Sequence, residues 1–169
     1  MDEERTPGQS PPVDGAGLRF VMSRFATGIA VVAGRDEERR PRAITVNAFS
    51  SLSLDPPLVL YCLDRSAFHF DVFSKAEAFA VSILAADQQA LSERFAREAE
   101  DDFADLSAFE LTTGCPVLAG CLAALDCETA ARHEAGDHLI VIGRVTALHV
   151  RDAAEPLIYF RGDYRRLRT

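Results

Sequence analysis

The sequence predicts a mainly β protein, a small antiparallel barrel that is closed or split and carries a few short helices. Six or seven segments have the pattern of strands, and most of the connections between them suit antiparallel neighbours. Strands and helices do not alternate regularly along the chain. The glycine-rich segments also lack the GxGxxG spacing, so a Rossmann fold is not expected.

The first part of the predicted domain opens with a helix and continues with strands. Leu18, Val21, Met22 and Phe25 recur at i, i+3, i+4 and i+7, which is the spacing of one helical face. We expect Gly28 to end this helix. Strands are predicted over 29–33, 44–52 and 58–63, and the charged stretch 35–42 is predicted to be a hairpin connection.

The sequence Asp55-Pro56-Pro57 separates the second and third of these strands. Each proline lacks the backbone N–H that a sheet ladder uses. Such residues are confined to the margins of sheets, so this turn is expected at a sheet edge.

The second part of the domain is expected to combine two short helices with further strands. Ser66 is the predicted N-cap of a helix that runs to Ser74, with Phe70 and Phe73 on its inner side. Asp87 is expected to cap the next helix, after which a polar, acidic segment follows. The remaining strands are predicted over 79–84, 122–131, 138–150 and 157–160, and a Glu-Ala-Gly-Asp turn joins the two long ones.

Length and charge limit the function classes. The 169 residues favour one domain with its own core, and the net charge of −8 disfavours nucleic-acid binding. Residues 1–17 are acidic and rich in proline and glycine, so we expect a disordered arm ahead of a domain over 18–169. No apolar run is long enough for a membrane span and no signal peptide is recognisable, which favours a cytoplasmic protein.

The four cysteines, Cys62, Cys115, Cys121 and Cys127, show no CxxC spacing. No metal site is therefore expected, and the thiols are interpreted as small buried hydrophobes. Cys62 lies on a predicted strand beside a polar segment, where it could line a pocket.

That polar segment is the most informative part of the chain. Thr45, Asn47, Ser50, Ser51 and Ser53 offer many hydrogen-bond donors and acceptors without a charge. Such a lining suits a polar heteroaromatic ring with a phosphorylated tail. The same residue types are also common on solvent-facing strands, so the segment alone does not decide between the two interpretations.

Two places near helix ends could contact a phosphate. Arg65 and Ser66 combine a guanidinium and a hydroxyl at a predicted helix start, where an anion is stabilised. Phe95 and Arg97 stand at the end of the next predicted helix. Phe95 alone suits the core, and Arg97 could either reach a phosphate oxygen or interact with the helix C-terminus.

The sequence Gly136-Asp137-His138 opens a strongly apolar strand. His138 could bind the phosphates or ribose of a nicotinamide cofactor, or stack beside its ring, and Asp137 could orient the imidazole. The alternative is an exposed histidine in a turn. No Ser-His-Asp or Cys-His arrangement is supported.

Several of these segments, in their order and spacing, resemble the short-chain flavin reductases, the reductase components of two-component flavin-dependent monooxygenases. The resemblance covers nearly all of the chain after the N-terminal arm. It is carried by the segments MSRFATG from Met22, TVNAFSSLS from Thr45, DPPLV from Asp55, CLDRS from Cys62, GDH from Gly136, IGRV from Ile142 and PLIYFRG from Pro156.

The resemblance implies an FMN-binding split barrel that works as a homodimer and holds FMN or FAD in a groove near the subunit interface. Thr45, Asn47, Ser50 and Ser51 would contact the isoalloxazine and ribityl groups. Ser66 and Arg97 would hold the phosphate, and His138 would help to dock NADH or NADPH. The complete predicted cofactor-binding set is Thr45, Val46, Asn47, Ala48, Ser50, Ser51, Cys62, Asp64, Ser66, Phe95, Arg97, Asp137, His138 and Tyr159.

The implied reaction is hydride transfer from nicotinamide C4 to flavin N5, a chemistry that belongs to the cofactors. The reduced flavin would then leave for a partner monooxygenase. Two alternatives remain, a related oxidase that retains its flavin and a non-catalytic flavin carrier. The choice of FMN or FAD, of NADH or NADPH, and of the partner oxygenase is not determined by the sequence.

Overall fold

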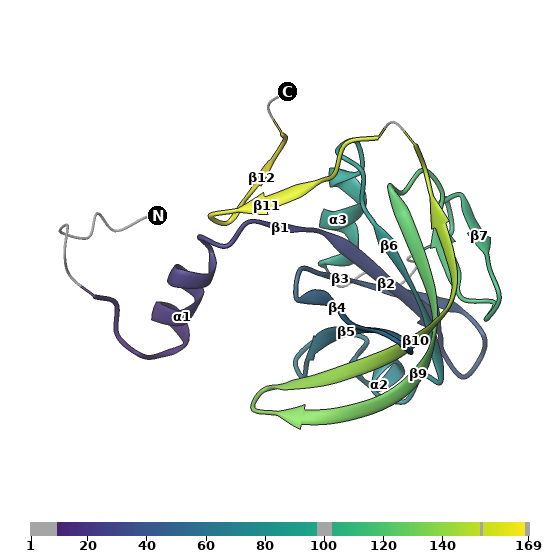
Figure 1. Ribbon diagram of the computed structural model, residues 1–169, viewed down its shortest axis with the longest axis horizontal. Coiled ribbons are helices and arrows are strands. Elements are labelled where there is room, and N and C mark those ends of the chain that lie inside the picture. Colours follow the sequence, from purple (N-terminus) through teal and green to yellow (C-terminus); the bar gives the residue numbers. More distant parts are fainter. Residues whose placement is uncertain (1–9, 98–102, 153, 168–169) are drawn as a thin grey trace.

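A curled antiparallel sheet of seven strands forms the body of the molecule (Figure 1). The computed structural model describes residues 10–97, 103–152 and 154–167. Within them the strand order is β3-β2-β6-β9-β10-β5-β4, and every neighbouring pair is antiparallel. The bounds are Ala30–Arg35 (β2), Pro41–Val46 (β3), Phe49–Leu54 (β4), Pro57–Asp64 (β5), Ala78–Ile83 (β6), Ala123–Ala135 (β9) and His138–Val150 (β10). The predicted antiparallel, mainly β fold is confirmed.

The two edge strands, β3 and β4, are consecutive in the chain. Only Asn47 and Ala48 separate them, yet the strands lie at opposite ends of the strand order. Because three Cα steps cover at most about 11 Å, the sheet has to curl until its edges approach each other. The ladders of the described residues include no pairing between β3 and β4, so the barrel is split along this line.

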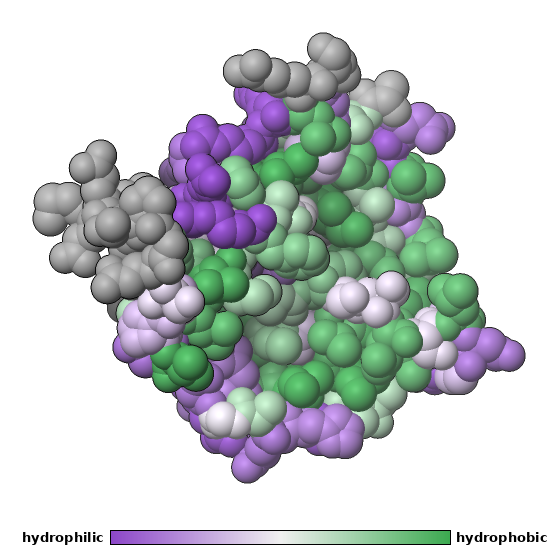
Figure 2. Space-filling model, turned by 60° about the vertical axis from the view of Figure 1, so that its left-hand side comes forward, coloured by the Kyte–Doolittle hydropathy of each residue, from purple (hydrophilic) through white to green (hydrophobic). Residues whose placement is uncertain are grey.

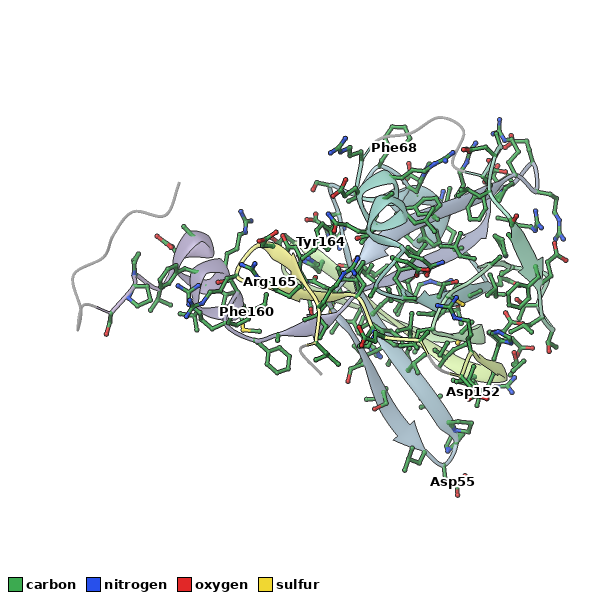
Figure 3. The ribbon with its side chains drawn as sticks, turned by 90° about the horizontal axis from the view of Figure 1, so that it is seen from above. Asp55, Phe68, Asp152, Phe160, Tyr164 and Arg165 are labelled. Atoms are coloured by element: carbon green, nitrogen blue, oxygen red, sulfur yellow. The ribbon has the colours of Figure 1, made fainter. Side chains whose placement is uncertain are left out.

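The turn between β4 and β5 confirms the predicted position of the two prolines. Leu54 pairs with Pro57 at the end of the hairpin, and β4 is the last strand of the sheet. The Asp55–Pro56 peptide bond is cis. Asp55 marks the tip of this hairpin, which projects from the barrel (Figure 3).

Strand β2 is buried on both faces over residues 30–34, which explains why this part of its sequence is uniformly apolar. Because side chains alternate across a strand, Ala30 and Val32 join the core inside the barrel and Val31 and Ala33 join a second core outside it. The inner core contains the fully buried rings of Tyr61, Phe73 and Phe79. The outer core contains Leu84, Phe95, Leu118 and Leu157, which pack against the other face of β2 and β3.

Gly143 lets β10 pass close to a core ring. A Cβ atom at this position would lie 2.4 Å from Cζ of Phe79 and 3.0 Å from Cβ of Cys127. The β9–β10 register shifts between Ile142 and Gly143. A glycine is therefore required for the barrel wall to close over Phe79.

The three helices are shorter than predicted or begin elsewhere. Helix α1 spans Gly15–Met22, with the Asp14 carboxylate accepting a hydrogen bond from the N–H of Gly17 at 2.7 Å. Its end at Met22 leaves Phe25 and Gly28 outside the helix, so the predicted end at Gly28 is wrong. Of the predicted arm over 1–17, residues 1–9 lie outside the described residues.

Neither predicted N-cap is a cap in the structure. Helix α2 spans Phe70–Phe73 with His69 before it, and α3 spans Gln89–Phe95 with Gln88 before it. Neither helix has a side-chain cap hydrogen bond. Ser66 instead lies in a turn held by Asp64, and Asp87 faces Arg151 at 3.9 Å.

Short strands form two smaller sheets, and of these strands the sequence predicted only the one over 157–160, which is β11. One has the order β1-β11-β12, with bounds Thr27–Gly28, Ile158–Phe160 and Asp163–Arg165. The other pairs β7 (Ala108–Glu110) with β8 (Pro116–Leu118). The three-stranded sheet stands between the barrel and α1, which projects away from the barrel (Figure 1).

Cys115, Cys121 and Cys127 are buried, as predicted, and burial raises the pKa of each thiol. All four cysteines are free. Across the described ranges, no helix has both the length and the apolar character needed to cross a membrane.

We expect Gly143→Ala to lower the free energy of unfolding by about 1–3 kcal/mol, because the added methyl group overpacks the contact with Phe79. Gly28→Ala is the matched control, since a Cβ there meets no atom within 4 Å. Chemical denaturation of the two variants checks this prediction. Equal stabilities would show that the barrel wall does not need a glycine at position 143.

Candidate functional site

The line along which the barrel is split opens into a groove of about 760 Å³. It is bordered by α1, β4, β5 and the turn between β11 and β12, and we call it the split-edge groove. It is lined by Arg19, Met22, Ser23, Phe25, Thr27, Asn47, Ala48, Phe49, Ser50, Leu60, Cys62, Tyr159 and Gly162. A pocket of about 320 Å³ shares four of these residues and extends to Val46.

Six of the predicted site residues line these two cavities: Val46, Asn47, Ala48, Ser50, Cys62 and Tyr159. The fold explains how Tyr159, far away in the sequence, lines the same groove as Asn47. Tyr159 pairs with Thr27 in the small sheet, and the chain continues from β1 directly into β2, the neighbour of β3. The split therefore gathers three separate segments of the chain around one groove.

The lining combines aromatic faces with a few uncharged polar groups. Phe25, Phe49 and Tyr159 supply the rings. Asn47 is exposed, and the buried Thr27 hydroxyl has no hydrogen-bond partner among the described residues. A buried hydroxyl left unpaired is costly, so this group favours a ligand that offers a polar atom. Burial raises the pKa of the Cys62 thiol, which keeps it neutral.

Thr45 does not line the groove, because it points to the opposite face of β3. Its hydroxyl donates to the carbonyl of Ser92 in α3 at 2.8 Å. The Ser92 hydroxyl is 3.0 Å from the Tyr164 hydroxyl, and the Tyr164 ring packs edge-on against Tyr159. Figure 3 shows Tyr164 between α1 and the barrel. Thr45 thus supports the groove wall from behind.

Three further predicted residues are also outside the groove. Phe95 is 4% exposed and packs on Phe103 with ring centroids 5.4 Å apart, so it belongs to the outer core. Arg97 is exposed after the end of α3, and Ser51 is exposed on β4. None of the three is among the residues that line the split-edge groove.

The remaining predicted residues gather in a polar cluster where β5 ends and β10 begins. His138 pairs with Asp64 across the two strands, and its Nδ1 lies 2.7 Å from Asp137 Oδ1. The predicted contact between Asp137 and the imidazole is therefore present. The hydrogen bond and the charge of His138 lower the pKa of Asp137.

Ser66 belongs to this cluster and not to a helix start. Its backbone N–H and its hydroxyl both donate to Asp64 Oδ1, at 2.7 and 2.8 Å. These bonds, with smaller effects from the charges of His138 and Arg19, lower the pKa of Asp64. Ser66 therefore does not begin a helix, and both of its donors are bonded to the Asp64 carboxylate. Its predicted contact with a phosphate stays a prediction.

A second cavity of about 760 Å³ lies between the β2–β3 hairpin and α2. Its lining is dominated by charges that are already paired. Arg40 and Arg42 both contact Asp36, at 2.9 and 3.1 Å. The split-edge groove, with open polar groups and aromatic walls, is the better candidate for a ligand site.

Sequence reasoning missed Arg19, Phe25, Thr27 and Gly162 as lining residues. Arg19 and Phe25 fall within the predicted opening helix, which was given no part in the site. Thr27 lies in a two-residue strand and Gly162 in the turn between β11 and β12, and such short segments have no periodic signal in the sequence.

Apolar side chains beside the groove are exposed in this chain. Leu18, Val21 and Met22 on α1 are exposed, as is Phe25 after it at 67%. Leu52 and Leu54 on β4 are exposed too. Figure 2, which turns the α1 side forward, shows apolar residues over much of this face.

The solved structures that resemble this split antiparallel barrel include flavin reductases. Residues 22–168 match the family of the flavin reductase like domain, and the chain belongs to that family.

Particular relatives carry more specific names. The chain is 42% identical over 149 residues to "FMN reductase (NADH) SmoA" of Agrobacterium fabrum, covering 88% of this chain and 84% of that protein. It is 34% identical over 152 residues to "Flavin-dependent monooxygenase, reductase subunit HsaB" of Rhodococcus jostii, covering 90% and 77%. Some relatives are longer, and the chain spans 48% of a "Probable flavin reductase" of Rhizobium meliloti.

A solved structure agrees with the fold. The NADH:FAD oxidoreductase SgcE6 of Streptomyces globisporus, in complex with NAD and FAD fragments, superimposes with a TM-score of 0.88 at 34% identity. The comparison covers 95% of this chain and 96% of that one.

The lowered pKa of Asp64 predicts a pH-dependent contribution to stability. A lowered pKa means that folding favours the ionised carboxylate. Its contribution is therefore present above the ordinary value of 3.8 and is lost as the pH falls through the folded-state pKa.

We expect Asp64→Asn to be less stable than the wild type at neutral pH, with a difference that shrinks as the solution is acidified below pH 3.8. Denaturant unfolding across this range checks it, with Asp55→Asn at the exposed hairpin tip as the control. A difference that does not change with pH would contradict the prediction.

Proposed function

We propose that this chain is an NAD(P)H:flavin oxidoreductase that binds FMN or FAD in the split-edge groove and releases the reduced flavin to a partner monooxygenase. The observation that carries the proposal is the groove, which collects five of the predicted cofactor-binding residues, with a sixth, Val46, in the adjoining pocket, in a chain of the flavin reductase family. The names of SmoA, HsaB and SgcE6 support the same chemistry and the same kind of partner.

The groove suits the two sides of an isoalloxazine ring. Phe25, Phe49 and Tyr159 provide flat apolar contacts, while Asn47 and Ser50 face its polar edge. A bound flavin accepts a hydride from a reduced nicotinamide, so the chemistry belongs to the cofactors. The work of this chain is to orient the two rings and to exclude water between them.

His138 is proposed to dock the nicotinamide cofactor at the end of β5 and β10. Its imidazole is held by Asp137 at 2.7 Å, and its side chain is 39% exposed, so a ligand has access to it. It lies outside the groove lining, which keeps nicotinamide docking separate from the contacts to the flavin ring.

Reduction of free flavin tests the proposed function. Purified protein is mixed anaerobically with NADH or NADPH, and FMN, FAD or riboflavin is added in turn. We expect nicotinamide oxidation that requires added flavin and turns over many equivalents. Flavin binding without turnover would contradict the proposal and favour a carrier. Flavin reduction only by an organic substrate would favour an oxidase.

Two substitutions separate the flavin and nicotinamide sites. Asn47→Leu leaves the polar edge of the ring unpaired, so the Kd for flavin should rise about tenfold or more, with Gln89→Leu on α3 as the amide control. His138→Ala should raise the KM for NADH with little change in the Kd for flavin. Fluorescence quenching and steady-state kinetics measure both, and parallel losses in the two variants would contradict the assignment.

A homodimer is part of the same proposal. Exposed apolar residues lie on α1 and β4, two of the elements that border the groove, and α1 projects from the barrel with little of its own chain to cover it (Figure 1). A second copy of the chain would bury this surface and close the groove on its open side. Such burial contributes about 25 cal/mol per Å².

We expect Val21→Glu to shift the protein from dimer to monomer, because it places a charge in the apolar surface of α1. Leu148→Glu is the control, since Leu148 is an exposed apolar residue of β10 outside the groove lining. Light scattering after size exclusion measures the mass. A monomeric wild type would contradict the dimer, and so would a Val21→Glu variant that remains dimeric.

The four free cysteines suit a reducing compartment, and a cytoplasmic location is therefore part of the proposal. Fractionation of cells that produce the protein tests it, and recovery with exported proteins would contradict it.

A further inference from the structure

Arg19 is the one charged residue that lines the split-edge groove, within the part of the chain that the structure describes. It lies on α1, one helical turn before Met22 and Ser23, which also line the groove. No carboxylate of the described residues is within ion-pair distance of its guanidinium. The charge of Arg19 makes a small contribution to the lowered pKa of Asp64, but the Asp64 carboxylate is already hydrogen-bonded to Ser66.

Arg24, the next arginine along the chain, differs from Arg19 because its guanidinium already has partners. Arg24 Nη1 donates to the Ser23 hydroxyl at 2.6 Å, and its guanidinium stacks over the Phe20 ring at 4.2 Å. Arg24 is therefore engaged within α1 and its surroundings and does not line the groove. The guanidinium of Arg24 is therefore engaged by its own segment, whereas that of Arg19 has no ion-pair partner among the described residues.

Among the described residues that line the groove, no other side chain carries a positive charge. Ser66 and Arg97, the predicted phosphate residues, do not line it, and Ser66 is committed to a carboxylate that repels phosphate. An arginine guanidinium binds phosphate oxygens through two parallel N–H bonds, and such charge-assisted bonds are about twice as strong as neutral ones.

We propose that Arg19 binds a phosphate group of a ligand held in the split-edge groove. The inference rests on the proposed function and deepens it, because it names the residue that selects phosphorylated ligands. Two sources share this chemistry, the 5′-phosphate of the flavin and the pyrophosphate of the nicotinamide dinucleotide. Arg19 then acts as a specificity residue, since it contacts the ligand far from the atoms between which the hydride moves.

The experiment compares ligands with and without phosphate. Wild type, Arg19→Gln, Arg19→Lys and the control Arg24→Gln are each titrated with FMN and with riboflavin. The KM is then measured for NADH and for dihydronicotinamide riboside, which lacks the phosphates. We expect Arg19→Gln to raise the Kd for FMN or the KM for NADH by about tenfold to a hundredfold. Its phosphate-free counterpart should be unchanged, and Arg19→Lys should recover part of the loss.

The pattern of losses identifies the phosphate. A loss for FMN but not for riboflavin assigns Arg19 to the flavin phosphate, and a loss for NADH but not for the riboside assigns it to the nicotinamide pyrophosphate. Equal losses with and without phosphate would overturn the inference and indicate a structural role, and so would no loss for either pair. A wild type that reduces no flavin in the anaerobic assay would overturn the proposed function as well, so the two failures are distinguishable.

Discussion

The structure depends on one constraint, the two-residue link between the edge strands of the main sheet. Asn47 and Ala48 join β3 to β4, which stand at opposite ends of the strand order. The sheet can satisfy this link only by curling, and the unpaired edges then leave a split. The N–H of Cys62 donates to the carbonyl of Ala48 at 3.0 Å, which fixes the link against β5. Asn47, the polar residue of the link, consequently lines a groove and does not lie on an ordinary strand face.

The second organising feature is the burial of β2 on both faces. One face fills the barrel and the other supports an outer core with α3 and the C-terminal segment. That outer core positions the small sheet of β1, β11 and β12, which brings Tyr159 to the groove. Packing on the side of the sheet away from the groove therefore determines which aromatic residue lines it.

The sequence predicted those features that local patterns determine. The long apolar strands, the proline turn at the sheet edge and the groove residues Asn47, Ser50 and Cys62 are where they were expected. Ser66 and Asp87 are not the N-caps that the sequence predicted. A residue suited to an N-cap is equally suited to a turn, and tertiary contacts determine which of the two forms. The predicted helix over Leu18 to Phe25 has an apolar face, but no pattern shows that this face is left uncovered by its own chain.

The location of the flavin in the split-edge groove is the central claim, and a crystal structure with FMN tests it most directly. The molecule has a second cavity of the same volume between the β2–β3 hairpin and α2, which makes the comparison informative. We expect the isoalloxazine ring between Asn47 and Tyr159, along the line where the barrel is split. Flavin bound instead between Arg40 and Lys75 in the second cavity would contradict it.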